Sequence, residues 1–131
     1  MNWVVTLIIN ADQTIEERLR GLVDYIFKRD KIENILIYDI DATGKKGNLL
    51  TKKMNSLKGG YLALDKNELS ILMSESGQIF ELDLYLKSSY QFRIVVRDGS
   101  VIDLLGTGEM IPMEAIGNYE QIDINLYRTK K

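Results

Sequence analysis

Residues 79–96, with the sequence IFELDLYLKSSYQFRIVV, contain the pattern that decides the fold. Apolar side chains occupy every second position from residue 80 to 86 and again from residue 92 to 96. A period of two is typical of a β-strand with one apolar and one polar face. The Asp98-Gly99 pair that follows favours a tight hairpin, because both of its positions accept positive φ readily. The stretch therefore predicts consecutive antiparallel strands.

The same period of two also occurs before and after this stretch. It predicts further strands at residues 61–64, 69–74, 101–105 and 121–127. Residues 106–118, which are bounded by glycines, interrupt the pattern and are expected to form an irregular crossover that fills a gap in the core. Successive strands of this kind are typical of an antiparallel sheet with one face open to water.

The N-terminal part of the chain predicts a strand, a helix and a second strand. Residues 3–10 are apolar on both faces, which favours a central strand covered on both sides. Thr14 and Glu17 match a capping box at the start of a helix over residues 14–29. The apolar stripe of this helix consists of Ile15, Leu19, Leu22, Val23 and Ile26, with Arg18, Arg20 and Asp24 largely off it. Residues 35–40 form the second predicted strand.

Together these elements predict an α+β fold in a single domain, residues 1–131. A β-α-β start leads into an antiparallel meander, and one main helix packs on one face of a sheet of about five to seven strands. The two opening strands need not be adjacent in the sheet.

Histidine and cysteine are both missing from the 131 residues. Disulfides, thiolate nucleophiles and cysteine zinc sites are therefore excluded, as are the Ser–His and Cys–His catalytic pairings. No apolar run approaches the roughly 20 residues that span a bilayer, and the N-terminus resembles a first strand more than a signal peptide. We expect a cytoplasmic protein with no cofactor and no membrane partner.

Charge is segregated along the chain. Residues 44–60 carry five lysines and no acid, and residues 128–131 add three basic side chains. Removing these eight positive charges from the net charge of −2 leaves −10 on the remainder. We expect residues 44–60 to form a mobile basic loop, with a short amphipathic helix or a contact to an anionic partner as alternatives. The acidic remainder and the absence of aromatic residues from this loop argue against nucleic acid.

The second predicted strand ends in Asp39 and Asp41, followed by Thr43. An apolar strand leading into Asp-x-Asp-x-Thr resembles the first motif of the haloacid dehalogenase-type phosphatases. The resemblance covers about nine residues and implies Asp39 as nucleophile, Asp41 as acid/base and a bridging magnesium ion. It also implies a fold in which strands alternate with helices, whereas the second half of this chain predicts successive hairpins.

The two aspartates also match the first positions of an EF-hand calcium loop. Leu50 stands where that loop needs a glutamate, and Lys46 replaces its apolar position. We therefore expect Asp39 and Asp41 to share one side of a strand end and to face Lys45, Lys46 or an arginine, with no metal and no catalytic role.

The polar faces of the predicted strands supply the candidate binding residues. We expect a continuous surface formed by Glu81, Asp83, Tyr85, Arg93, Asp103, Asp123 and Tyr127. Tyrosine among carboxylates suits an interface with a basic partner. The alternative is a solvated face held by cross-strand pairs, such as Asp83 with Arg93.

These features favour a non-catalytic protein-binding domain. Its most specific form is an immunity or antitoxin-like inhibitor that neutralises a partner protein, such as a basic nuclease toxin, through the acidic sheet face. Two alternatives stay open. One is a magnesium-dependent phosphatase-like enzyme that uses Asp39 and Asp41, and the other is a homodimeric assembly module that pairs through a sheet edge.

Overall fold

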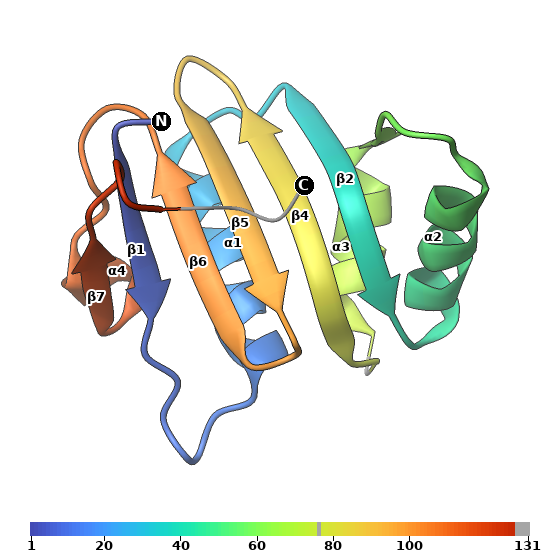
Figure 1. Cartoon of the computed structure of the whole chain (residues 1–131), viewed down its shortest axis with the longest axis horizontal. Coiled ribbons are helices and arrows are strands. Elements are labelled where there is room, and N and C mark those ends of the chain that lie inside the picture. Colours follow the sequence, from blue (N-terminus) through green and yellow to red (C-terminus); the bar gives the residue numbers. More distant parts are fainter. Residues whose placement is uncertain (76, 128–131) are drawn as a thin grey trace.

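The computed structural model describes residues 1–75 and 77–127. Its sheet has seven strands in the order β3-β2-β4-β5-β6-β1-β7, and all neighbours are antiparallel. Figure 1 shows helices α1 and α3 behind this sheet, with its front face turned to the viewer. In chain order the elements are β1 (Trp3–Leu7), α1 (Ile15–Arg29), β2 (Asn34–Ala42), α2 (Lys45–Ser56), β3 (Leu62–Leu64), α3 (Lys66–Ser74), β4 (Ile79–Lys87), β5 (Gln91–Arg97), β6 (Val101–Gly106), α4 (Met113–Ile116) and β7 (Tyr119–Ile122).

The antiparallel meander predicted from the alternating sequence is confirmed. β4 pairs with β5, and β5 pairs with β6, so consecutive strands are neighbours in the sheet. Asp98 and Gly99 connect β5 to β6 with φ values of 55° and 62°, the positive angles that the predicted hairpin requires. The fold is α+β, with helices against one face of an antiparallel sheet.

The β-α-β start is also confirmed, although its two strands lie far apart. β4, β5 and β6 stand between β2 and β1, and α1 crosses behind them to connect the two (Figure 1). The predicted capping box begins this helix. The Thr14 hydroxyl accepts a hydrogen bond from the Glu17 N–H at 3.0 Å, and the Glu17 carboxylate accepts one from the Thr14 N–H at 2.8 Å.

A large apolar cluster fills the space between the sheet and the helices. Leu84, Ile94 and Leu104 come from the three strands of the meander and are fully buried. Leu19 and Ile26 of α1 belong to the same cluster. Because burial of one such side chain contributes about 1.5–3 kcal/mol, this layer is the main source of stability.

A smaller apolar cluster lies on the opposite face of the sheet. Val4 of β1, Val95 of β5 and Leu105 of β6 are buried there. Ile122 and Tyr127, from the end of β7 and the segment after it, pack on these three side chains. β1 is therefore covered on both sides, as its sequence predicted, but it lies next to the edge strand β7 instead of at the centre.

The strand predicted at residues 69–74 is wrong, because these residues belong to helix α3. Asp65 caps this helix: its carboxylate accepts from the Glu68 N–H at 2.7 Å, and the Glu68 carboxylate accepts from the Asp65 N–H at 3.1 Å. The buried positions of α3 recur three and four residues apart. In so short an apolar run that spacing is difficult to distinguish from a buried strand.

The mobile loop expected at residues 44–60 is wrong as well, because most of it forms helix α2. Glu75, at the end of α3, accepts hydrogen bonds from the N–H groups of Lys46 at 2.9 Å and Gly47 at 2.7 Å. These N–H groups belong to the first turn of α2. A carboxylate at the N-terminus of a helix satisfies N–H groups that have no partner within the helix and complements the helix dipole. The alternative of a short amphipathic helix is therefore confirmed in part: Leu50 is buried against the body, whereas Leu49 and Leu57 are exposed.

Two further expectations differ from the structure. The strand predicted at residues 121–127 is wrong over most of its length, because β7 runs from Tyr119 to Ile122 and residues 124–126 form a turn. Arg18, expected off the buried face of α1, is buried, and its guanidinium donates hydrogen bonds to the carbonyls of Ile8, Ile116 and Asn118. These bonds satisfy carbonyl groups between the helix and the sheet, which explains why a charged side chain lies there.

Replacing Asp65 by alanine tests the cap of α3. The variant leaves the Glu68 N–H without its acceptor, and we expect the free energy of unfolding to fall by about 0.5–2 kcal/mol. Asp65→Asn keeps an acceptor at the same place and should remain close to wild type. Urea denaturation followed by circular dichroism measures both variants. An equal loss in the two, or no loss in the alanine variant, would contradict this role.

Candidate functional site

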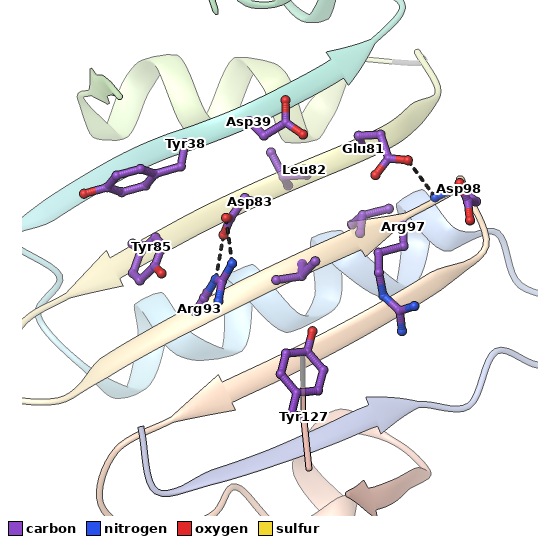
Figure 2. Close-up of a pocket in the computed structure, with 12 residues that line it drawn as sticks. Tyr38, Asp39, Glu81, Leu82, Asp83, Tyr85, Arg93, Arg97, Asp98 and Tyr127 are labelled. Atoms are coloured by element: carbon purple, nitrogen blue, oxygen red, sulfur yellow. Dashed lines mark hydrogen bonds and ion pairs between the residues drawn. The ribbon is translucent and has the colours of Figure 1, made fainter. Parts of the chain in front are cut away.

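The face of the sheet opposite α1 contains a shallow hollow of about 720 Å³. Its floor comes from β2, β4 and β5, and Tyr127 lies at its β6 side (Figure 2). The polar and aromatic side chains that line it are Tyr38, Asp39, Glu81, Asp83, Tyr85, Arg93, Arg97, Asp98 and Tyr127. Glu81, Asp83 and Tyr85 reach this surface because Leu82, Leu84 and Leu86, which alternate with them along β4, are buried in the core.

A β-bulge in β2 determines which side chains reach this surface. The register of β2 on β4 shifts between Ile37 and Asp39, which leaves Tyr38 as an extra residue. The bulge keeps Ile40 in the core, and it turns both Tyr38 and Asp39 toward the open face (Figure 2). Without it, strict alternation would place Asp39 in the core and Ile40 in water.

Arg93 binds Asp83 through two parallel hydrogen bonds. Nε and Nη2 each donate to one carboxylate oxygen at 2.8 Å, and the guanidinium carbon lies 5.3 Å from the ring centroid of Tyr85. The side chains of Arg93 and Asp83 are only 14% and 19% exposed, so solvent screens this ion pair less than one on the surface. The hydrogen bonds to Asp83 raise the pKa of the Arg93 guanidinium, and burial raises the pKa of the Tyr85 phenol.

Two pairs of acids face each other across β2 and β4. Asp39 is opposite Asp83, and Asp41 is opposite Glu81. Asp83 has Arg93 as its partner, whereas no residue in the described part of the chain donates a hydrogen bond to the side chain of Asp39 or Asp41. Like charges directly opposite each other in a sheet are destabilising. This end of the hollow therefore carries a negative charge that the described residues do not balance.

Three tyrosines form a row beside these acids. The ring centroids of Tyr61 and Tyr38 are 5.4 Å apart, and those of Tyr38 and Tyr85 are 4.9 Å apart. Tyr61 is 51% exposed and Tyr38 is 39% exposed, so large parts of both rings contact solvent. Tyrosine is one of the residue types enriched in interface hot spots.

Asp103 connects the C-terminal segment to the sheet. Its side chain is fully buried. The carboxylate accepts hydrogen bonds from the Thr6 hydroxyl at 2.6 Å, from the Arg97 guanidinium at 2.8 Å and 3.0 Å, and from the Tyr127 hydroxyl at 2.9 Å. A buried carboxylate is tolerated only with such partners. Burial and the bond to Asp103 raise the pKa of the Tyr127 phenol far above its ordinary value.

The structure brings most of the predicted binding residues onto one surface. Those that line the hollow are Glu81, Asp83, Tyr85, Arg93 and Tyr127. Asp103 lies beneath the surface and contributes to it only through the positions of Arg97 and Tyr127. Asp123 lies after β7 as an exposed residue, and its carboxylate accepts from the Asn125 N–H at 2.9 Å. Their role in binding a partner stays a prediction.

Sequence reasoning did not assign Tyr38, Asp39 and Tyr61 to this surface. The signal for the first two was the spacing of Ile35, Ile37 and Ile40, which changes from two to three and so requires one extra residue in the strand. The expectation that Asp39 and Asp41 share one side of β2 is confirmed, but no described lysine or arginine pairs with either of them. Tyr61 reaches the row through the pairing of β3 with β2, which no local pattern indicates.

The fold implied by the phosphatase resemblance is not found, because the sheet is antiparallel throughout. In residues 1–75 and 77–127, no group of three or more acidic side chains is placed to hold a metal ion.

None of the helices in the described part of the chain has the length and apolarity needed to cross a membrane. No family model matches the chain, and the comparisons found no similar characterised protein and no similar solved structure. The function must therefore be inferred from the surface itself.

The acid pairs predict an unusual effect of removing a charge. Asp39→Asn abolishes the repulsion from Asp83, and we expect the free energy of unfolding to rise by roughly 0.2–1 kcal/mol. Asp24→Asn, on the exposed side of α1, is the matched control and should change stability little. Urea denaturation at low ionic strength measures both variants. A loss of stability in Asp39→Asn would show that this carboxylate is stabilised by partners.

The raised pKa of Tyr127 predicts a loss of stability at alkaline pH. The unfolded phenol releases its proton near pH 10, whereas the folded protein retains it to higher pH because burial disfavours the phenolate and Asp103 accepts the hydrogen bond of the phenol. The folded state then binds more protons than the unfolded state, so stability decreases as pH rises above about 10.

Tyr127→Phe removes this titration and one hydrogen bond to a buried carboxylate. We expect a cost of about 1–3 kcal/mol at neutral pH and a weaker decline between about pH 9 and 11 than in wild type. Urea denaturation of the wild type and of Tyr127→Phe at neutral pH, at about pH 9 and at about pH 11 measures the cost and the two declines. Parallel declines in the two proteins would contradict the assignment.

Proposed function

We propose that this chain is a non-catalytic protein-binding domain whose open sheet face binds and neutralises a basic partner. Its most specific form is an immunity or antitoxin-like inhibitor, with a toxin such as a nuclease as the partner. The observation that carries the proposal is the hollow, in which the exposed Tyr38 and the carboxylate of Asp39, which has no partner among the described residues, both line the surface. Tyr61 and Asp41 lie at its border, Tyr61 against Tyr38 and Asp41 opposite Glu81.

The charge distribution supports a basic partner. The chain outside residues 44–60 and 128–131 has a net charge of −10. The described residues that line the hollow include the acids Asp39, Glu81, Asp83 and Asp98 and the two arginines Arg93 and Arg97, so acids outnumber bases there. The lysines of α2 lie beyond β2 at one end of the sheet (Figure 1). An acidic face of this kind would attract a basic protein at long range and disfavour acidic ones.

The construction of the surface supports binding with little rearrangement. Asp39, Glu81 and Asp83 stand on the paired strands β2 and β4, as do Tyr38 and Tyr85. The bidentate Asp83–Arg93 contact holds the centre of the hollow in one arrangement. Binding by such a surface loses little conformational entropy, which favours tight association.

Capture of the partner by charge-reversed variants tests the proposal. The immobilised wild-type chain, Asp39→Lys/Asp41→Lys and the control Asp12→Lys/Asp24→Lys are each exposed to a lysate of the cells that encode the chain. The control makes the same change in net charge, at exposed positions outside the hollow. Any captured protein is purified with the chain, sized by light scattering and assayed for its own activity with and without it.

We expect a stoichiometric complex, loss of the partner's activity within it, and at least about tenfold weaker capture by the face variant than by the control. Equal capture by the two variants would place the interface elsewhere. A captured protein that keeps full activity would contradict inhibition, and a stable dimer of the isolated chain with no other partner would favour a homodimeric assembly module.

A further inference from the structure

The open face contains the same combination of tyrosine and aspartate twice. On β4, Tyr85 and Asp83 bind the guanidinium of Arg93. The guanidinium donates two hydrogen bonds to the carboxylate of Asp83 and lies over the ring of Tyr85. On the neighbouring strand β2, Tyr38 and Asp39 stand beside Tyr85 and Asp83 in the same left-to-right order in Figure 2. The first pair is occupied by an arginine of the chain, and in the described residues the second is not.

We propose that Tyr38 and Asp39, with Tyr61, bind an arginine side chain of the partner protein. This inference rests on the proposed function and specifies the chemistry by which the face recognises its partner. The guanidinium would donate to the carboxylate of Asp39 and lie against the exposed ring of Tyr38, as Arg93 does with Asp83 and Tyr85. The ring of Tyr61, whose centroid lies 5.4 Å from that of Tyr38, would form the outer wall of the arginine site.

Register and charge both support this site. Asp39 is directly opposite Asp83, so the chain places two carboxylates together and supplies one arginine. The remaining negative charge opposes folding unless a cation approaches from outside. The bulge at Tyr38 is what brings an aromatic ring and this carboxylate to the same face from adjacent positions in the chain.

The geometry favours arginine over lysine. A guanidinium is planar, makes two parallel hydrogen bonds to one carboxylate and stacks on an aromatic ring with little loss of hydration. A lysine ammonium is a compact, strongly hydrated charge that gains less from the ring. Lys87 lies 5.6 Å from the ring centroid of Tyr85, and no carboxylate in the described residues forms an ion pair with it.

The experiment uses two short peptides as probes of the intact chain. Acetyl-Gly-Arg-Gly-amide and acetyl-Gly-Lys-Gly-amide are titrated separately into the ¹⁵N-labelled protein at constant ionic strength, and amide chemical shifts give the dissociation constants. The variants are Asp39→Asn, Tyr38→Leu and Tyr61→Leu, with Asp24→Asn as the matched control on the helical side. The same spectra show whether each variant is folded.

We expect the arginine peptide to shift the amides around Tyr38, Asp39 and Tyr61 most and to bind at least about threefold more tightly than the lysine peptide. Asp39→Asn should weaken arginine binding at least about threefold, and either tyrosine variant should remove most of the preference over lysine. Asp24→Asn should behave as wild type. Equal affinity for the two peptides, shifts spread over all exposed acids, or equal effects of Asp39→Asn and Asp24→Asn would each overturn the site.

The outcomes for this site and for the proposed function are distinguishable. A face that captures a protein partner but does not prefer the arginine peptide would retain the proposed function and reject the arginine site. A clear arginine preference at Tyr38 and Asp39, together with equal capture by the charge-reversed variant and its control, would retain the site and reject the proposed interface.

Discussion

Burial of one face of the sheet against α1 is the constraint from which the rest of the structure follows. Side chains alternate between the two faces of a strand, so each leucine that enters the core commits its neighbours to the other side. In β4 this rule buries Leu82, Leu84 and Leu86 and leaves Asp83 and Tyr85 on the open face. The composition of the candidate surface is therefore a consequence of how the core is built.

The bulge at Tyr38 in β2 interrupts this alternation, and it changes the surface. One extra residue keeps Ile40 in the core and presents two consecutive polar side chains, Tyr38 and Asp39, on the same face. Bulges often redirect side chains near functional sites. Here the redirection places a second tyrosine and aspartate beside Tyr85 and Asp83, so a local irregularity creates chemistry that two regular strands would not supply.

Asp103 and Asp39 have opposite environments in the folded protein. Asp103 is completely buried, and hydrogen bonds from Thr6, Arg97 and Tyr127 satisfy its carboxylate. Asp39 is exposed, faces another carboxylate and has no described donor. The first arrangement serves stability, since loss of a partner would leave a buried charge uncompensated. The second places like charges opposite each other, an arrangement that is destabilising in a sheet and that the proposed binding of a cationic side chain would relieve.

The sequence by itself determined the α+β class, helix α1 with its capping box and the meander through Asp98-Gly99, because long periodic patterns and turn residues act locally. The short apolar run of α3 fits either period and was predicted as a strand, and no sequence pattern indicated where β1, β2, β3 and β7 stand in the sheet. Only the tertiary structure decided that Tyr61, Tyr38 and Tyr85 form one row and that Tyr127 reaches the buried carboxylate. Those contacts depend on strand register and on packing between distant segments, which local sequence does not encode.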